Sequence, residues 1–123
     1  MKPTIKALTF FLVSLFIASV VWAEVEVPEK IIKVAPIYKN AKVIQSMQFE
    51  EGDQTIYEVS TEQKQIVKFY KDTMQEKGWK VVMEMNMENN SMLNLAKDNM
   101  TLVVNTSVNQ EGKTTVQLIL QNK

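Results

Sequence analysis

Apolar residues between positions 60 and 79 recur at intervals of three and four, the spacing that aligns side chains along one face of an α-helix. Most charged residues of this stretch fall off that face. A helix of ~17 residues is marginal on its own, so its apolar face has to be buried against another element. The pattern therefore predicts one amphipathic helix with apolar positions at Ile66, Phe69, Tyr70, Thr73 and Met74.

Both ends of this helix carry end signals. Ser60 and Gln63 have the spacing of a capping box, in which each side chain hydrogen-bonds a free backbone N–H near the helix start. Thr61 is an alternative N-cap one residue later. Gly78 suits the left-handed residue that closes a helix, and Trp79 can fold back onto the last turn. We expect the helix to lie between Ser60 and Trp79.

Apolar and polar residues alternate after the helix, which indicates half-buried β-strands. Four such segments follow one another, and we expect an antiparallel meander whose apolar face meets the helix. The apolar positions predicted to face the helix are Trp79, Val81, Met83, Met85, Met87, Leu93, Leu95, Met100, Leu102, Val104, Val116, Leu118 and Leu120.

Three turns predict the registers of these strands, because a slip of one residue would turn a whole apolar set to the wrong face. They are a two-residue turn at 98–99, a three-residue loop at 110–112 with Gly112 in the left-handed region, and a loop at 88–90 with Asn90 in that role. The opposed pairs are Leu95 with Leu102, Leu93 with Val104, Val104 with Leu118, Leu102 with Leu120, Met85 with Leu93, and Met83 with Leu95.

Two further strands are predicted before the helix, Lys42–Phe49 and Thr55–Val59, joined as a β-hairpin around residues 50–53. Residues 24–41, which two prolines interrupt, are predicted to form an extended N-terminal arm and a turn. The predicted fold class is α+β, an antiparallel sheet in the order ββαββββ (β-hairpin, helix, four-stranded meander) with one helix packed on one face. Residues 42–123 would form this single α+β domain.

Residues 1–23 have the features of a secretory signal peptide. Lys2 and Lys6 give a basic start, an uncharged apolar run follows, and Val21–Ala23 fits a signal-peptidase site. The alternative is an uncleaved membrane anchor, because the apolar run is just short of the usual span. Cleavage would give an exported chain, periplasmic or secreted, that begins at Glu24 and has no stable membrane insertion.

Two short motifs carry a resemblance to a known domain. Residues 36–41 have the sequence Pro-Ile-Tyr-Lys-Asn-Ala, and the helix holds Phe69-Tyr70-Lys71 before its Gly78-Trp79 ending. These motifs resemble a small domain that recurs in exported bacterial proteins and lipoproteins, with a Pro-x-Tyr-Pro-Gly-Ala turn and a Phe-Tyr…Gly-Trp helix ending. Here a Lys and an Asn replace the second Pro and the Gly. The motifs are structural, so the resemblance carries over no activity and assigns no site.

Missing residue types restrict the chemistry. The chain has no Cys, His or Arg, which rules out nucleophile–histidine pairs and the usual zinc and non-haem iron sites. The lack of Arg and the slight acidity left after the basic start is removed argue against nucleic acid as a partner. Glu50, Glu51 and Asp53 share one turn, where solvated charges are a simpler interpretation than a weak Ca²⁺ site. We expect no enzyme activity and no cofactor.

Methionine forms the one unusual constellation. Met83, Met85 and Met87 alternate along one predicted strand, which places three thioethers on one side. Thioethers are soft ligands that suit Cu(I) or Ag(I). The other interpretation, which we favour, makes them core residues, because they share a face with Trp79 and Val81 and Met fills irregular gaps. The chain would then hold no metal.

The second face of the predicted meander has no helix to cover it. Val82, Met92, Val103 and Ile119 would form an apolar island there, among polar residues that include Glu84. Interaction surfaces have this composition, and so do solvated faces with scattered apolar residues. We expect a non-enzymatic interaction module of the bacterial envelope, with an envelope protein or a second copy as partner. A periplasmic Cu(I)- or Ag(I)-binding protein is the alternative.

Overall fold

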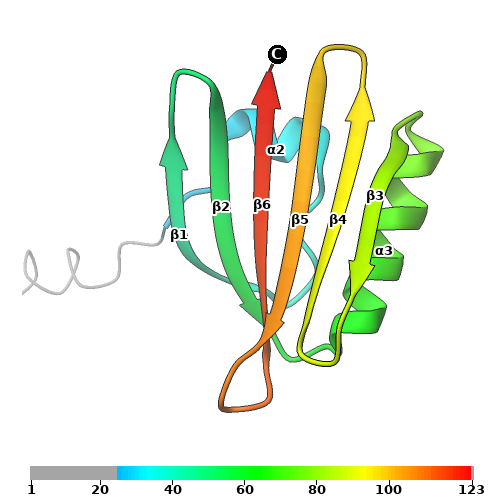
Figure 1. Ribbon diagram of the computed structural model, residues 1–123. Coiled ribbons are helices and arrows are strands. Elements are labelled where there is room, and N and C mark those ends of the chain that lie inside the picture. The colour runs from blue at the N-terminus through cyan, green and yellow to red at the C-terminus, as the bar shows by residue number, and fades with distance from the viewer. Residues whose placement is uncertain (1–24, 123) are drawn as a thin grey trace, which may run out of the picture.

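The computed structural model describes residues 25–122, which form two helices and one antiparallel sheet of six strands (Figure 1). The order of strands across the sheet is β1-β2-β6-β5-β4-β3, so β1 and β3 are its edges. The elements are α2 Glu29–Val34, β1 Lys42–Gln48, β2 Gly52–Val59, α3 Gln63–Glu76, β3 Lys80–Asn86, β4 Asn90–Lys97, β5 Met100–Val108 and β6 Thr114–Asn122.

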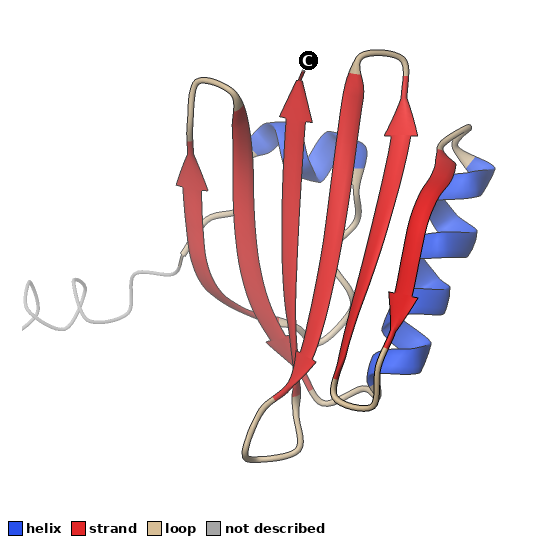
Figure 2. Cartoon of the chain, viewed as in Figure 1, coloured by secondary structure: helices blue, strands red, loops and turns tan. Residues whose placement is uncertain are grey.

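The predicted α+β class with an antiparallel sheet is confirmed, but the predicted order of elements is wrong at its start. A helix, α2, precedes the first strand, which gives the order αββαββββ. The hairpin β1–β2 does not stand apart from the meander, because β2 pairs with the last strand β6 along its whole length. One continuous sheet therefore supports both helices, which lie on the same side of it (Figure 2).

Helix α2 replaces the extended arm predicted for residues 24–41. Ile31 of this helix and Ala35, the residue that follows the helix, have no exposed area and belong to the core. This segment is therefore part of the domain. Pro28, interpreted as an interruption, is the N-cap residue, ahead of the interior positions where Pro would remove a helix hydrogen bond. Glu29 and Lys33 form an ion pair of 3.4 Å along the exposed side.

Helix α3 ends as predicted and begins differently. Trp79 N–H donates to Met74 C=O and Gly78 N–H to Gln75 C=O, both at 3.0 Å, the two bonds of a Schellman ending. The capping box at Ser60 is wrong, because the N-cap is Glu62 and it makes no side-chain cap bond. Gln63 instead donates to the backbone C=O of residues 87 and 88, at 3.1 and 3.2 Å, and so holds the helix start against the β3–β4 turn.

The core lies between the sheet and the two helices. Helix α3 packs against β5, β4 and β3, while α2 packs against β2. At the centre the hydroxyls of Tyr57 and Tyr70 hydrogen-bond each other, and Tyr70 also donates to the C=O of Pro36 at 2.8 Å. The largest fully buried side chains are Tyr57, Tyr70, Ile31, Ile66, Met74, Leu93, Leu95, Leu102, Leu118, Val104, Val116 and Thr55.

Two of the three predicted turn registers are confirmed and one is wrong. Leu95 opposes Leu102 across the turn at 98–99, and Leu102 opposes Leu120 across the loop at 110–112. In the β3–β4 hairpin, however, Val81 opposes Leu95 and Met83 opposes Asn94, so a β-bulge inserts one extra residue between them. The turn there is also tighter than predicted: Met87 N–H donates to Asn90 C=O at 2.8 Å, and Asn90 does not have positive φ.

The loop between β5 and β6 yields a test of its backbone. Gly112 has φ 80°, and a Cβ added there would meet nothing within 4 Å, so the cost of a side chain comes from the backbone alone. We expect Gly112→Val to lower the free energy of unfolding by about 1–2 kcal/mol in urea titrations. Gln110→Val, two residues away in the same loop, should change it by less than about 0.5 kcal/mol. Equal losses in the two variants would contradict the assigned loop geometry.

The buried tyrosine pair yields a pH test. Burial raises the pKa of Tyr57 to about 12, while the unfolded chain ionises near pH 10. The contribution of Tyr57 to the free energy of unfolding is therefore fully present below pH 10. As the pH rises from 10 toward 12, this contribution falls by roughly 2–3 kcal/mol. Burial also raises the pKa of Tyr70.

We expect urea titrations between pH 8 and 11.5 to show a free energy of unfolding that falls more steeply above pH 10 in the parent protein than in Tyr57→Phe. The comparison uses slopes, because the variant also loses a hydrogen bond at every pH. Parallel slopes would mean that Tyr57 ionises in the folded protein as it does in water.

Candidate functional site

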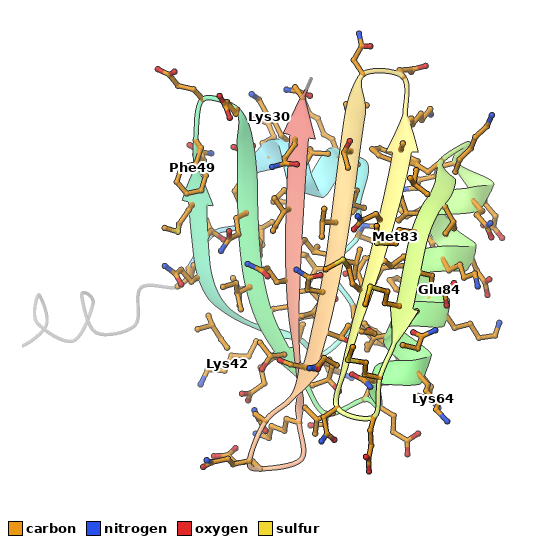
Figure 3. The ribbon with its side chains drawn as sticks, in the orientation of Figure 1. Lys30, Lys42, Phe49, Lys64, Met83 and Glu84 are labelled. Atoms are coloured by element: carbon orange, nitrogen blue, oxygen red, sulfur yellow. The ribbon has the colours of Figure 1, made fainter. Side chains whose placement is uncertain are left out.

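The side of the sheet away from α2 and α3 is uncovered by any other described element, and we call it the open face (Figure 3). Its side chains are those that alternate with the core residues along each strand. Across the four central strands these side chains are half-buried by one another. They are Gln54, Ile56, Glu58, Met92, Asn94, Ala96, Thr101, Val103, Asn105, Thr115, Gln117 and Ile119.

Strand pairing arranges this face in rows that cross the whole sheet. Each row runs from one edge strand to the other through directly opposed residues, whose side chains touch. One row is Met83, Asn94, Val103, Ile119, Gln54 and Met47. The next row is Met85, Met92, Asn105, Gln117, Ile56 and Gln45.

The residues predicted for an interaction face lie on or beside this surface. Val103 and Ile119 oppose each other at its centre, and Met92 lies in the adjacent row. Val82 is the extra residue of the β-bulge at the edge, and 66% of its surface is exposed. The structure thus brings three of the four together and places the fourth at the rim.

Glu84 was predicted on this second face and lies on the other side of the sheet. The bulge at Val82 reverses the alternation of β3, so Glu84 opposes the core residue Leu93. It forms an ion pair of 2.7 Å with Lys71 of α3. The hydrogen bond from Lys71 lowers the pKa of the Glu84 carboxyl, and a hydrogen bond from Asn86 adds to the effect.

The same reversal overturns the core interpretation of the methionines. Met83 and Met85 face the open side, and the exposed fractions of Met83, Met85 and Met87 are 45%, 44% and 59%. Val81, before the bulge, still packs against the core. Nothing in the spacing of the sequence marks the bulge, because Val81 and Val82 are equally apolar.

Two asparagines on the open face carry buried atoms without hydrogen-bond partners. The Oδ1 atoms of Asn94 and Asn105 are inaccessible to solvent and accept no hydrogen bond from the described residues. Asn105 does use its Nδ2, which donates to Gln117 Oε1 at 3.1 Å. No pattern in the sequence signals that these two acceptors lack hydrogen-bond partners.

A groove of about 640 Å³ lies on the helix side, between α3 and β3. Its charges largely neutralise one another, because Lys71 pairs with Glu84 and Lys68 with Asp72, each at 2.7 Å. These ion pairs leave little net electrostatic field to attract a charged ligand. The groove is therefore a weaker candidate for a functional site than the open face. The residues that line it are Gln63, Lys64, Val67, Lys68, Lys71, Asp72, Glu84, Asn86, Met87 and Glu88.

The carboxylates of the β1–β2 turn are not brought together. Asp53 is 4% exposed and points to the core side of β2, while Glu50 and Glu51 are exposed in the turn itself. Within residues 25–122 no three His, Cys, Asp or Glu side chains form a group that could hold a metal ion.

Comparison with known proteins gives one match. The sequence model of a family described as START domain-like matches residues 39–115, which include β1 to β5 and α3. No curated protein and no solved structure matches the chain. Among the described residues, no helix has the length and apolar character needed to cross a membrane. The segment predicted as a signal peptide, residues 1–23, lies outside the described residues.

Proposed function

The chain belongs to the START domain-like family, and no described element covers the second side of its sheet, so we propose that it is a small exported binding module whose open face holds another protein of the bacterial envelope. It acts by binding and not by catalysis. The observation that carries this proposal is the composition of the open face: half-buried apolar side chains lie among polar ones, and no described element covers them.

The apolar part of the face supplies the contact area. Val103 and Ile119 are directly opposed at the centre, with Ile56 and Met92 in the next row. A partner that covers these four side chains removes apolar surface from water, at about 25 cal/mol per Å². Methionines at the β3 edge extend the surface with flexible side chains, which adapt to the shape of a partner.

The polar side chains of the open face define what the partner has to present. Gln54, Thr101 and Gln117 lie among the apolar residues of the four central strands. A polar group that an interface desolvates without a hydrogen-bond partner costs about 1–3 kcal/mol, so the partner has to supply matching groups. A protein surface with hydroxyl, amide or ammonium groups among apolar side chains fits this requirement.

A second copy of the chain presents the same mixture of apolar and polar groups, including the hydroxyls of Thr101 and Thr115. We commit to a different protein as partner, and the cross-linking test below separates the two cases. Its place in the envelope follows from the signal peptide expected at residues 1–23 and from the resemblance to domains of exported bacterial proteins.

Export has its own test, in the native host. The intact mass of the purified protein should correspond to a chain that begins at Glu24, because Val21–Ala23 fits a signal-peptidase site. If the chain is recovered from the membrane fraction with residues 1–23 retained, the protein is anchored in the membrane and is not exported as a free domain.

The binding face is tested by placing a photo-cross-linking amino acid at Val103 in the native host. Cross-linked products identified by mass spectrometry should contain one recurrent envelope protein. The same amino acid at Val108, at the end of the same strand in a position of core alternation, serves as the control and should not give that product. A product with twice the mass of the chain would mean self-association and would contradict the choice of a different protein.

A charge in the middle of the face then measures the contribution of that face. Val103→Glu should weaken binding of the identified partner by at least about tenfold in calorimetry, because the carboxylate would be desolvated in the interface. Val108→Glu carries the same change outside the face and should leave affinity unchanged. Both variants should keep the parent circular dichroism. Equal affinities for the parent and Val103→Glu would place the partner elsewhere on the molecule.

A further inference from the structure

A small cavity of about 250 Å³ opens at the β3 end of the open face. Three of its lining residues are methionines, Met85 and Met87 from the strand β3 and its turn and Met92 from β4. The other lining residues are Asn90, Ser91, Asn105 and Thr106. No charged side chain lines it, and this distinguishes it from the groove on the helix side.

The three methionines line the same cavity, and strand pairing accounts for two of them. Met85 and Met92 are direct cross-strand partners, whose Cβ atoms lie about 4.5–5.5 Å apart in such pairs. Met87 follows Met85 by two residues and lies at the mouth of the tight turn, where its N–H donates to Asn90 C=O. Each methionine side chain has three rotatable bonds, so the three sulfur atoms can converge without a change in the backbone.

Ser91 and Thr106 also line the cavity, but they alternate with the core residues of their strands, so their hydroxyls lie on the helix side of the sheet. The two hydroxyls hydrogen-bond each other there, and Thr106 donates to Gln63 Oε1 at 3.0 Å, so they do not compete as ligands. Asn105 is different, because its Oδ1 accepts no hydrogen bond within the described chain. A carbonyl dipole beside the methionines favours a ligand that carries positive charge.

From this geometry we propose that Met85, Met87 and Met92 form a site for a soft monovalent cation, Cu(I) or Ag(I). Thioethers select such ions, whereas Mg²⁺, Ca²⁺ and Mn²⁺ prefer carboxylate, carbonyl and water oxygens. The set differs from the three methionines that alternate along β3. Met83 lies in the neighbouring row opposite Asn94 and does not line the cavity, and Met92 of β4 takes its place.

Exposure makes the site accessible. Met85 and Met87 are 44% and 59% exposed, so an ion can reach the sulfur atoms without any opening of the core. Methionines buried among Leu and Val would have had no such access. The site overlaps the edge of the partner interface proposed above, because Met85, Met92 and Asn105 belong to one row of the open face.

The test is a titration of the protein purified from its native host with Cu(I), under anaerobic reducing conditions and against a chromogenic competing chelator. We expect one Cu(I) per chain. Met85→Leu, Met87→Leu and Met92→Leu should each weaken binding at least tenfold, because each removes one sulfur ligand while nearly conserving side-chain volume.

Two matched variants separate this site from general methionine content. Met83→Leu on the same strand and Met47→Leu on the opposite edge strand should bind Cu(I) as the parent does. X-ray absorption of the Cu(I)-loaded parent should show three sulfur neighbours, and Ag(I) should raise the Tm of the parent but not of the triple Leu variant.

Failure of the parent to compete for Cu(I), or binding that survives the triple change, would overturn the proposal. A loss in Met83→Leu equal to that in Met92→Leu would overturn the assigned ligand set. Cross-linking of a partner at Val103 is measured without metal. The result of the metal titration therefore does not decide whether the partner interface exists, and the cross-linking result does not decide whether the metal site exists.

Discussion

The hydroxyl of Tyr70 holds three separate segments of the chain together. It hydrogen-bonds the hydroxyl of Tyr57 on β2 and donates to the C=O of Pro36 in the segment that enters the sheet. Both tyrosines are fully buried, so each of these polar groups depends on the others for a partner. The network fixes α3 and the chain before β1 on one side of the sheet. Because both described helices pack on that side, none of residues 25–122 outside the sheet covers the other side.

A single extra residue at Val82 decides what the open face contains. Without the bulge, Met83 and Met85 would alternate into the core as Val81 does, and Glu84 would face outward. With it, Glu84 reaches Lys71 on the helix side, at 2.7 Å, and the thioethers join the open face. The other edge strand has a matching bulge at Ile44. Bulges at both edges discourage pairing of the edge strands with strands of other molecules. The bulge at Val82 therefore both protects its edge of the sheet and determines which side chains of β3 lie on the open face.

The parts of the fold that were predicted correctly have local causes. The turn at 98–99 and the loop ending at Gly112 set registers that the apolar alternation of both flanking strands supports, and the ending of α3 follows from Gly78 and Trp79. What escaped prediction depends on the rest of the fold. The bulge has no signature in the sequence. Helix α2 forms because its Ile31 is buried against the sheet, which is a tertiary contact. Of the open face, Met92, Val103 and Ile119 were predicted from the sequence, whereas Met83 and Met85 of β3 were not.

The composition of the open face is best understood as a compromise. Asn is disfavoured in strands relative to Val, Ile and Thr, and the buried Oδ1 atoms of Asn94 and Asn105 add a desolvation cost. A face of Val and Ile alone would make a more stable strand surface, but in the isolated chain it would be a large apolar patch that invites non-specific association. The polar side chains of the face break up that patch. A partner therefore has to present polar groups that match them as well as apolar ones, which is how a sheet surface becomes selective.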